Sequence, residues 1–160
     1  MSEQYEVISN WFVNKGIDDE KELSPQKLQN LLYLSHGWHL AIYDEPLLTE
    51  EFEAWKFGPM LNELYLKYKN IGNFLITIRE KKIPMEEKTE KFLDFIWDRY
   101  KIFSDEEIHS LTHQNDSPWK HIVNNPKKNA DQVIPNILLK NFYKLKYKTT
   151  IEKIKSLQEE

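Results

Sequence analysis

The sequence has no cysteine and only four glycines, and no stretch of it approaches the apolar length that a bilayer requires. Without cysteine, a disulfide framework, a Cys-based metal site and a Cys nucleophile are all excluded. The glycines stand far apart, so no phosphate-binding loop is indicated. The N-terminus lacks a basic segment followed by an apolar run, so no signal peptide is predicted. We therefore expect a soluble cytoplasmic protein that does not enter a membrane.

The size and composition of the chain predict one compact domain over residues 1–160. Its 160 residues are 40% hydrophobic and 13% aromatic, enough for a substantial core. The net charge of −4 is unevenly distributed: residues 1–116 carry 13 Lys/Arg and 22 Asp/Glu, a balance of −9, whereas residues 117–148 carry seven Lys and one Asp, a balance of +6. Each part is either a solvated face or a surface for a charged partner.

The segment 24–43 is predicted to form the central helix. Ser24 is a favourable N-cap, and Pro25 suits the first helical position. Apolar residues recur at the helical period from Leu28 to Ile42 and occupy most of the circumference. A helix that is apolar on nearly all sides is typically buried.

The remaining pattern predicts a mainly α fold, a single compact helical domain of seven or eight helices with a small β-hairpin-like element. Alternating residues predict a strand near 52–57, and a β-prone segment at 74–78 either pairs with it or runs irregularly. A first helix is expected to end near Gly16. Further helices are expected over 58–70, 86–103, 104–113, 117–123, 135–150 and 151–157, with polar loops at 79–88 and 124–131.

Four ordered motifs then identify a family. Residues 27–68 contain a KLQ-LLY-GW helix, a Pro-containing turn and an EFEAWK-GP segment, and an L-TH-PW motif follows within 111–119. This set resembles the Panacea antitoxin domain, also described as SocA-like or GepA-like. The motif-bearing core would span 24–123, with closing helices over 135–158. The positions with a structural role in the motifs are Trp38, Gly58, Pro59, His113, Pro118 and Trp119.

Two histidine pairs are candidates for chemistry. His109 and His113, at i and i+4, share a helix face and could bind a metal with Asp116 and His121. Helix-end histidines that bond the last carbonyls give the same pattern, and we prefer that interpretation. Residues 36 and 39 are a second pair, but no nucleophile stands beside them in a suitable setting. We predict no catalytic residue, no bound cofactor and no metal site, and hence no enzyme.

A lysine-rich helix at 138–150 interleaves lysines with aromatic residues, as single-stranded nucleic-acid platforms do. Lysines that extend over buried aromatic rings produce the same pattern, and the chain is acidic overall. Nucleic acid is therefore not the partner we expect.

The resemblance implies a non-enzymatic antitoxin that forms a hetero-oligomer with a toxin encoded by an adjacent gene. Relatives pair with several toxin classes, among them small alarmone-synthetase-like nucleotide transferases, and direct binding could occlude a nucleotide or substrate site. An adaptor that delivers the toxin to a protease, a phage-encoded inhibitor of host defence and a nucleic-acid-binding regulator remain alternatives. For the partner-binding surface we select aromatic residues and an acidic run: Trp55, Phe57, Tyr65, Tyr68, Glu50, Glu51 and Glu53.

Overall fold

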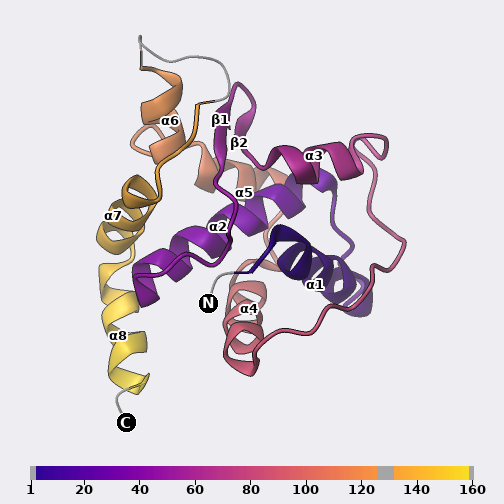
Figure 1. The fold of residues 1–160 in the computed structure, drawn as a ribbon, viewed down its shortest axis with the longest axis horizontal. Helices are drawn as coiled ribbons and strands as arrows, with labels where there is room; N and C mark the ends of the chain where they lie inside the picture. Colours follow the sequence, from indigo (N-terminus) through magenta and orange to yellow (C-terminus); the bar gives the residue numbers. More distant parts are fainter. Residues whose placement is uncertain (1–2, 126–131, 159–160) are drawn as a thin grey trace.

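The computed structural model describes residues 3–125 and 132–158, which form eight helices and a two-stranded antiparallel sheet (Figure 1). The mainly α prediction is confirmed. Within these residues, no helix has the length and apolarity to cross a membrane. The elements are α1 (Tyr5–Asp18), α2 (Pro25–Tyr43), β1 (Glu53–Trp55), β2 (Gly58–Met60), α3 (Asn62–Tyr68), α4 (Glu87–Tyr100), α5 (Asp105–Thr112), α6 (Pro118–Val123), α7 (Asn136–Lys146) and α8 (Lys148–Gln158).

Helix α2 lies at the centre, and α1, α3, α4, α5, α7 and α8 all contact it. The Ser24 hydroxyl accepts a hydrogen bond from the Lys27 N–H at 3.1 Å, which confirms the predicted N-cap. At the other end, Asp44 adopts the left-handed conformation (φ 57°) that stops the helix. The buried faces of α2 therefore organise the rest of the chain.

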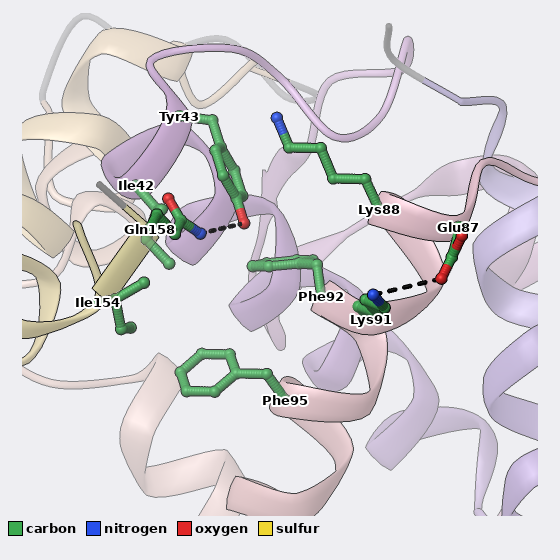
Figure 2. A pocket seen from close by; sticks show the side chains of 9 residues that line it. All are labelled: Ile42, Tyr43, Glu87, Lys88, Lys91, Phe92, Phe95, Ile154 and Gln158. Carbon is green, nitrogen blue, oxygen red and sulfur yellow. Dashed lines mark hydrogen bonds and ion pairs between the residues drawn. The ribbon is translucent and has the colours of Figure 1, made fainter. Parts of the chain in front are cut away.

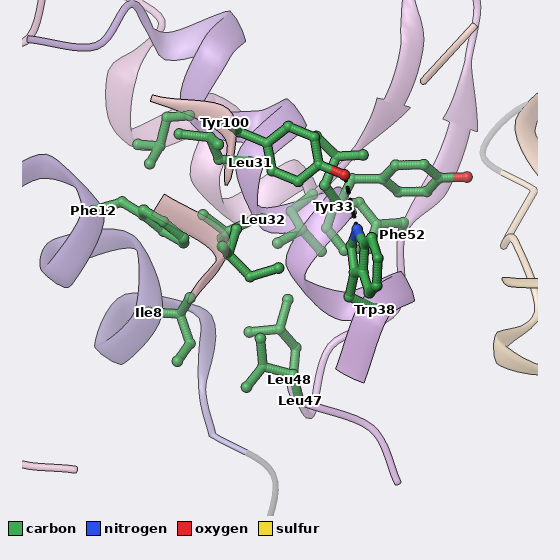
Figure 3. Close-up of a cluster of buried hydrophobic side chains, with 14 of the residues drawn as sticks. Ile8, Phe12, Leu31, Leu32, Tyr33, Trp38, Leu47, Leu48, Phe52 and Tyr100 are labelled. Atoms are coloured by element: carbon green, nitrogen blue, oxygen red, sulfur yellow. Dashed lines mark hydrogen bonds between the residues drawn. The ribbon is translucent and has the colours of Figure 1, made fainter. Parts of the chain in front are cut away.

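The core gathers around α2 from both sides (Figure 3). Helix α1 contributes Ile8 and Phe12, and the segment after α2 contributes Leu47, Leu48 and Phe52, all less than 2% exposed. Each large side chain buried in this way contributes about 1.5–3 kcal/mol before chain entropy is subtracted.

The hairpin differs from the prediction for residues 58–70. Gly58 begins strand β2, which pairs with β1 in the register Glu53↔Met60, Ala54↔Pro59 and Trp55↔Gly58. The predicted helix start at Gly58 is wrong, because Gly58 has φ 132°, which no helix accommodates. The helix begins only at Asn62.

Of the two alternatives for the β-prone segment 74–78, the structure shows the irregular one. Strand β1 is flanked by β2 and, on its other side, by the segment near Val133, where the Ala54 N–H donates to the Gln132 carbonyl at 2.8 Å. The Ile76 N–H instead donates to the Leu23 carbonyl at 2.7 Å. Because both edges of β1 are already occupied there, the 74–78 segment runs irregularly and leaves Phe74 81% exposed.

Two helix boundaries also differ from the predicted ones. Helix α1 continues past Gly16, which is buried where the Lys21 carbonyl would approach an added Cβ to 2.8 Å, so this glycine permits close packing and does not end the helix. The last two helices separate at Tyr147 and not at 150.

The predicted loop at 124–131 falls mostly outside the described residues, and the one at 79–88 is irregular up to 86.

Candidate functional site

The hairpin is fastened to the end of α5 by His113. The Nε2–H of His113 donates to the Phe57 carbonyl at 2.8 Å, and its Nδ1 lies 2.8 Å from the His109 carbonyl and 2.7 Å from the Thr112 hydroxyl oxygen. Because the Phe57 carbonyl can only accept, Nε2 carries a proton. The TH dipeptide of the motif therefore joins two backbone segments that are 56 residues apart.

Trp119 makes the second connection to the same hairpin. Its Nε1–H donates to the Trp55 carbonyl at 2.7 Å, and its ring lies 4.5 Å from the His113 ring. Helix α6 holds Trp119 in place, since Ser117 caps the helix and Pro118 occupies its first turn. We call these two hydrogen bonds, from His113 and Trp119 to the hairpin, the hairpin anchor.

Gly58 is required for this approach. A Cβ at Gly58 would lie 2.5 Å from His113 Nε2, and the φ of 132° is unfavourable for any other residue. Its neighbour Pro59 is buried in β2, a sheet position that suits a residue without an N–H because no further strand pairs on that side among the described residues. The GP motif thus shapes the hairpin itself.

The KLQ motif fixes backbone segments on the same side of α2. The Lys27 ammonium donates to the Phe103 carbonyl at 2.6 Å. The Gln29 side chain pairs with both backbone groups of Leu61, donating at 2.9 Å and accepting at 3.0 Å. This role of Gln29 is not predicted from the sequence; the signal for it is a polar side chain on an otherwise apolar helix face.

The two residues of the GW motif, Gly37 and Trp38, pack against Tyr143 of α7 and against Tyr147, which follows α7. A Cβ at Gly37 would lie 2.4 Å from the Tyr143 ring, so only glycine admits that ring. Trp38 stacks on Tyr147 at 4.3 Å between ring centroids and donates from Nε1 to the Tyr100 hydroxyl at 2.8 Å. The break between α7 and α8 thus falls at the residue whose ring stacks on Trp38.

The aromatic residues selected for partner binding separate into surface and core. Phe57 is 69% exposed and Tyr65 43% exposed, and Trp55 is half-buried with its ring edge against Tyr65 at 5.2 Å. These three residues form what we call the aromatic surface. Tyr68 is buried and its hydroxyl donates to Glu80 at 2.9 Å, so it belongs to the core and not to this surface.

The acidic run has internal partners at two of its three positions. The Glu50 carboxylate accepts from the Tyr5 N–H at 3.0 Å, at the start of α1, where the helix dipole favours a negative charge. The Glu53 carboxylate accepts from the Trp55 Nε1–H at 3.0 Å. Among the three, Glu51 is exposed whereas Glu50 and Glu53 are partly buried, so Glu51 is the member best placed to meet a partner.

The histidines have structural surroundings. His109 and His113 stack at 3.6 Å, and no group of three or more potential metal-binding side chains exists within residues 3–125 and 132–158. His36 accepts from the Leu48 N–H at Nδ1 (3.3 Å) and donates from Nε2 to Asn136 at 2.9 Å. Burial lowers the pKa of His36 to about 4, so it is neutral near pH 7.

A shallow hollow of about 640 Å³ lies away from the hairpin, between α4 and α8 (Figure 2). Phe92, Phe95 and Ile154 face it, and Gln158 donates to the Tyr43 hydroxyl at 3.2 Å on its rim. Because Ile151 is the only buried residue of α8, this helix is attached over a small area.

The motifs thus build a scaffold that presents a hairpin, and sequence comparison shows which family has a similar sequence. Residues 28–120 match the family described as "Antitoxin SocA-like, Panacea domain", and the chain belongs to this antitoxin family. Antitoxin SocA of Caulobacter vibrioides (strain NA1000 / CB15N) is similar to it, with 26% identity over 135 residues that cover 77% of this chain and 72% of the relative. No solved structure matches the chain significantly. The resemblance inferred from the motifs is confirmed.

Proposed function

We propose that this chain neutralises a cognate toxin by direct protein–protein binding through the aromatic surface, without catalysis of its own. One observation carries the proposal: the Phe57 ring is 69% exposed while its own carbonyl is held by His113 at 2.8 Å. A large exposed aromatic residue on a fixed backbone binds with a small loss of conformational entropy.

The bound antitoxin would cover the toxin's nucleotide or substrate site. A nucleotide transferase of the alarmone-synthetase-like type is one candidate toxin, because a cleft that binds phosphates is basic and the exposed Glu51 stands four residues before Trp55. The side chains of the scaffold motifs donate hydrogen bonds to backbone carbonyls of the antitoxin itself, whereas Phe57 and Tyr65 are exposed on its surface. Partner choice would therefore depend on the projecting residues.

The first experiment induces each flanking gene alone and then together with this chain, and scores colony formation. We expect one neighbour to be toxic, rescue by this chain, and a complex that co-purifies. The activity of that toxin is then measured with purified antitoxin and no protease present. Inhibition under these conditions supports occlusion of the toxin's site, because delivery to a protease could not occur. A toxic neighbour that is not rescued would contradict the proposal.

The surface is tested by Phe57→Ser, which removes the ring and keeps the carbonyl that His113 holds. We expect at least about tenfold weaker binding to the toxin and loss of rescue. Ile102→Ser is the matched control, since Ile102 is 73% exposed but lies beyond α4. Full rescue by Phe57→Ser would show that the toxin binds elsewhere.

A further inference from the structure

The lysine-rich segment at 138–150 is the feature that the proposed function leaves unused, and its aromatic residues are not available to nucleic-acid bases. Tyr143 is 2% exposed, and Tyr147 stacks on Trp38 at 4.3 Å. Phe142 is half-buried with its ring edge towards Tyr143. Stacking platforms need open ring faces, so these rings offer none for consecutive bases.

The exposed part of the segment borders a groove between α7 and α8. This groove, of about 410 Å³, is lined by Ala41, Asn141, Lys144, Leu145, Lys148, Ile151, Glu152 and Lys155, and we call it the basic groove. Leu145 is 80% exposed, whereas Ala41 and Ile151 at its base are buried. The groove therefore combines an apolar base, one projecting leucine and charged rims.

The charges of the rim are predominantly positive. Asp44 takes up part of the lysine charge, since it binds Lys144 at 2.6 Å and Lys140 at 2.9 Å. Lys148 and Lys155 form no ion pair within the described residues, and Glu152 is the only acidic residue that lines the groove there. The rim can accordingly accept carboxylates from a partner.

The spacing of these residues favours a helical partner. Lys148, Ile151, Glu152 and Lys155 fall at i, i+3, i+4 and i+7, one face of α8. Seven residues of helix rise about 10.5 Å, so the two lysines match carboxylates at i and i+7 on a neighbouring helix. Apolar side chains at i+3 and i+4 of that helix would then enter the groove beside Leu145.

We propose that the basic groove is a second docking surface, which binds an acidic amphipathic α-helix of a protein partner. Figure 1 shows α7 and α8 extending away from the hairpin, and the residues that line the basic groove include none of the three residues of the aromatic surface. The proposal goes beyond toxin neutralisation and does not require that the toxin bind the hairpin.

The test is an NMR titration of the full chain with a synthetic amphipathic peptide that carries Glu at i and i+7 and Leu at i+3 and i+4 in each repeat. We expect saturable shifts at Leu145 and Ile151. The Lys148→Glu, Lys155→Glu double variant should weaken binding at least about tenfold, and Glu152→Gln should strengthen it about twofold. Lys91→Glu with Lys153→Glu is the matched control for total charge and should bind almost as the parent does.

Three results would overturn the proposal. A scrambled peptide of the same composition could bind equally well, which would show charge attraction without a groove. The shifts could fall on the hairpin and not on α7 and α8. A single-stranded oligonucleotide could bind more tightly than the peptide and depend on Lys148 and Lys155, which would make this a nucleic-acid surface. Thermal unfolding of each variant confirms that its fold is retained.

Discussion

The Nε2 of His113 lies 2.8 Å from the carbonyl oxygen of Phe57. The imidazole at the end of α5 therefore holds the hairpin turn by the backbone of Phe57 and not by its side chain. The Phe57 ring is consequently left exposed in a fixed position. This relationship separates the residues that build the scaffold from those that can meet a partner.

Gly58→Ala should destabilise the protein by at least about 2 kcal/mol, because it combines an unfavourable φ of 132° with a Cβ 2.5 Å from His113 Nε2. Gly72→Ala is the matched control: Gly72 has φ 65°, but no atom lies within 4 Å of its Cβ position. It should cost only about 1 kcal/mol. Urea unfolding measures both. Equal losses would show that the approach of His113 does not matter.

Gly37→Ala should also destabilise the protein, although alanine is favoured over glycine in a helix by about 1 kcal/mol. The added Cβ would lie 2.4 Å from the Tyr143 ring, and overpacking of this kind costs about 1–3 kcal/mol. Adding Tyr143→Leu should recover part of that loss in a double-mutant cycle. A stabilised Gly37→Ala variant would contradict the packing described for α7.

Trp119→Phe should free the hairpin while leaving the core packed. The change removes the N–H that reaches the Trp55 carbonyl at 2.7 Å, at a cost of about 1–2 kcal/mol. We expect faster hydrogen exchange in β1 and β2. Trp97→Phe is the control, since it removes a hydrogen bond to Asp19 at 2.7 Å and should leave exchange in the hairpin unchanged. Unaltered hydrogen exchange in the hairpin of Trp119→Phe would show that the Trp119 hydrogen bond does not hold the hairpin in place.

Mild acid should destabilise the protein through His36. Its pKa is lowered to about 4 by burial, below the ordinary value of 6.5, so the unfolded chain binds the extra proton. This contribution to stability is complete above pH 6.5 and is lost as the pH falls towards 4. The full effect is on the order of 3 kcal/mol.

Urea unfolding at pH 7, 6 and 5 measures the His36 effect. His36→Gln cannot take up a proton, so its stability should fall less between pH 7 and 5 than that of the parent. His39→Gln is the comparison: burial also lowers the pKa of His39, although its Nδ1 donates to the Glu45 carbonyl at 2.7 Å, so this variant should remove a smaller part of the parent's pH dependence than His36→Gln does. Parallel pH profiles for His36→Gln and the parent would exclude His36 as the cause.

Local patterns in the sequence were sufficient for the helical class, the central helix and most caps. Ser24, the Ser104–Glu107 capping box and Ser117 act over three residues, so their hydrogen bonds are written into adjacent sequence. The Panacea motifs were sufficient for the family, because an ordered set of motifs is far more specific than any one. Neither source could say what the motif residues do.

Tertiary structure decided the rest, because it depends on contacts between distant residues. Gly58–Pro59 resembles a helix start until His113 approaches from 55 residues away and imposes the hairpin. The 74–78 segment has strand composition, but both edges of β1 are occupied. Tyr68 and Phe57 look alike as aromatic residues, and only packing buries the first and exposes the second. A side chain's type is local, whereas its exposure is a property of everything packed around it.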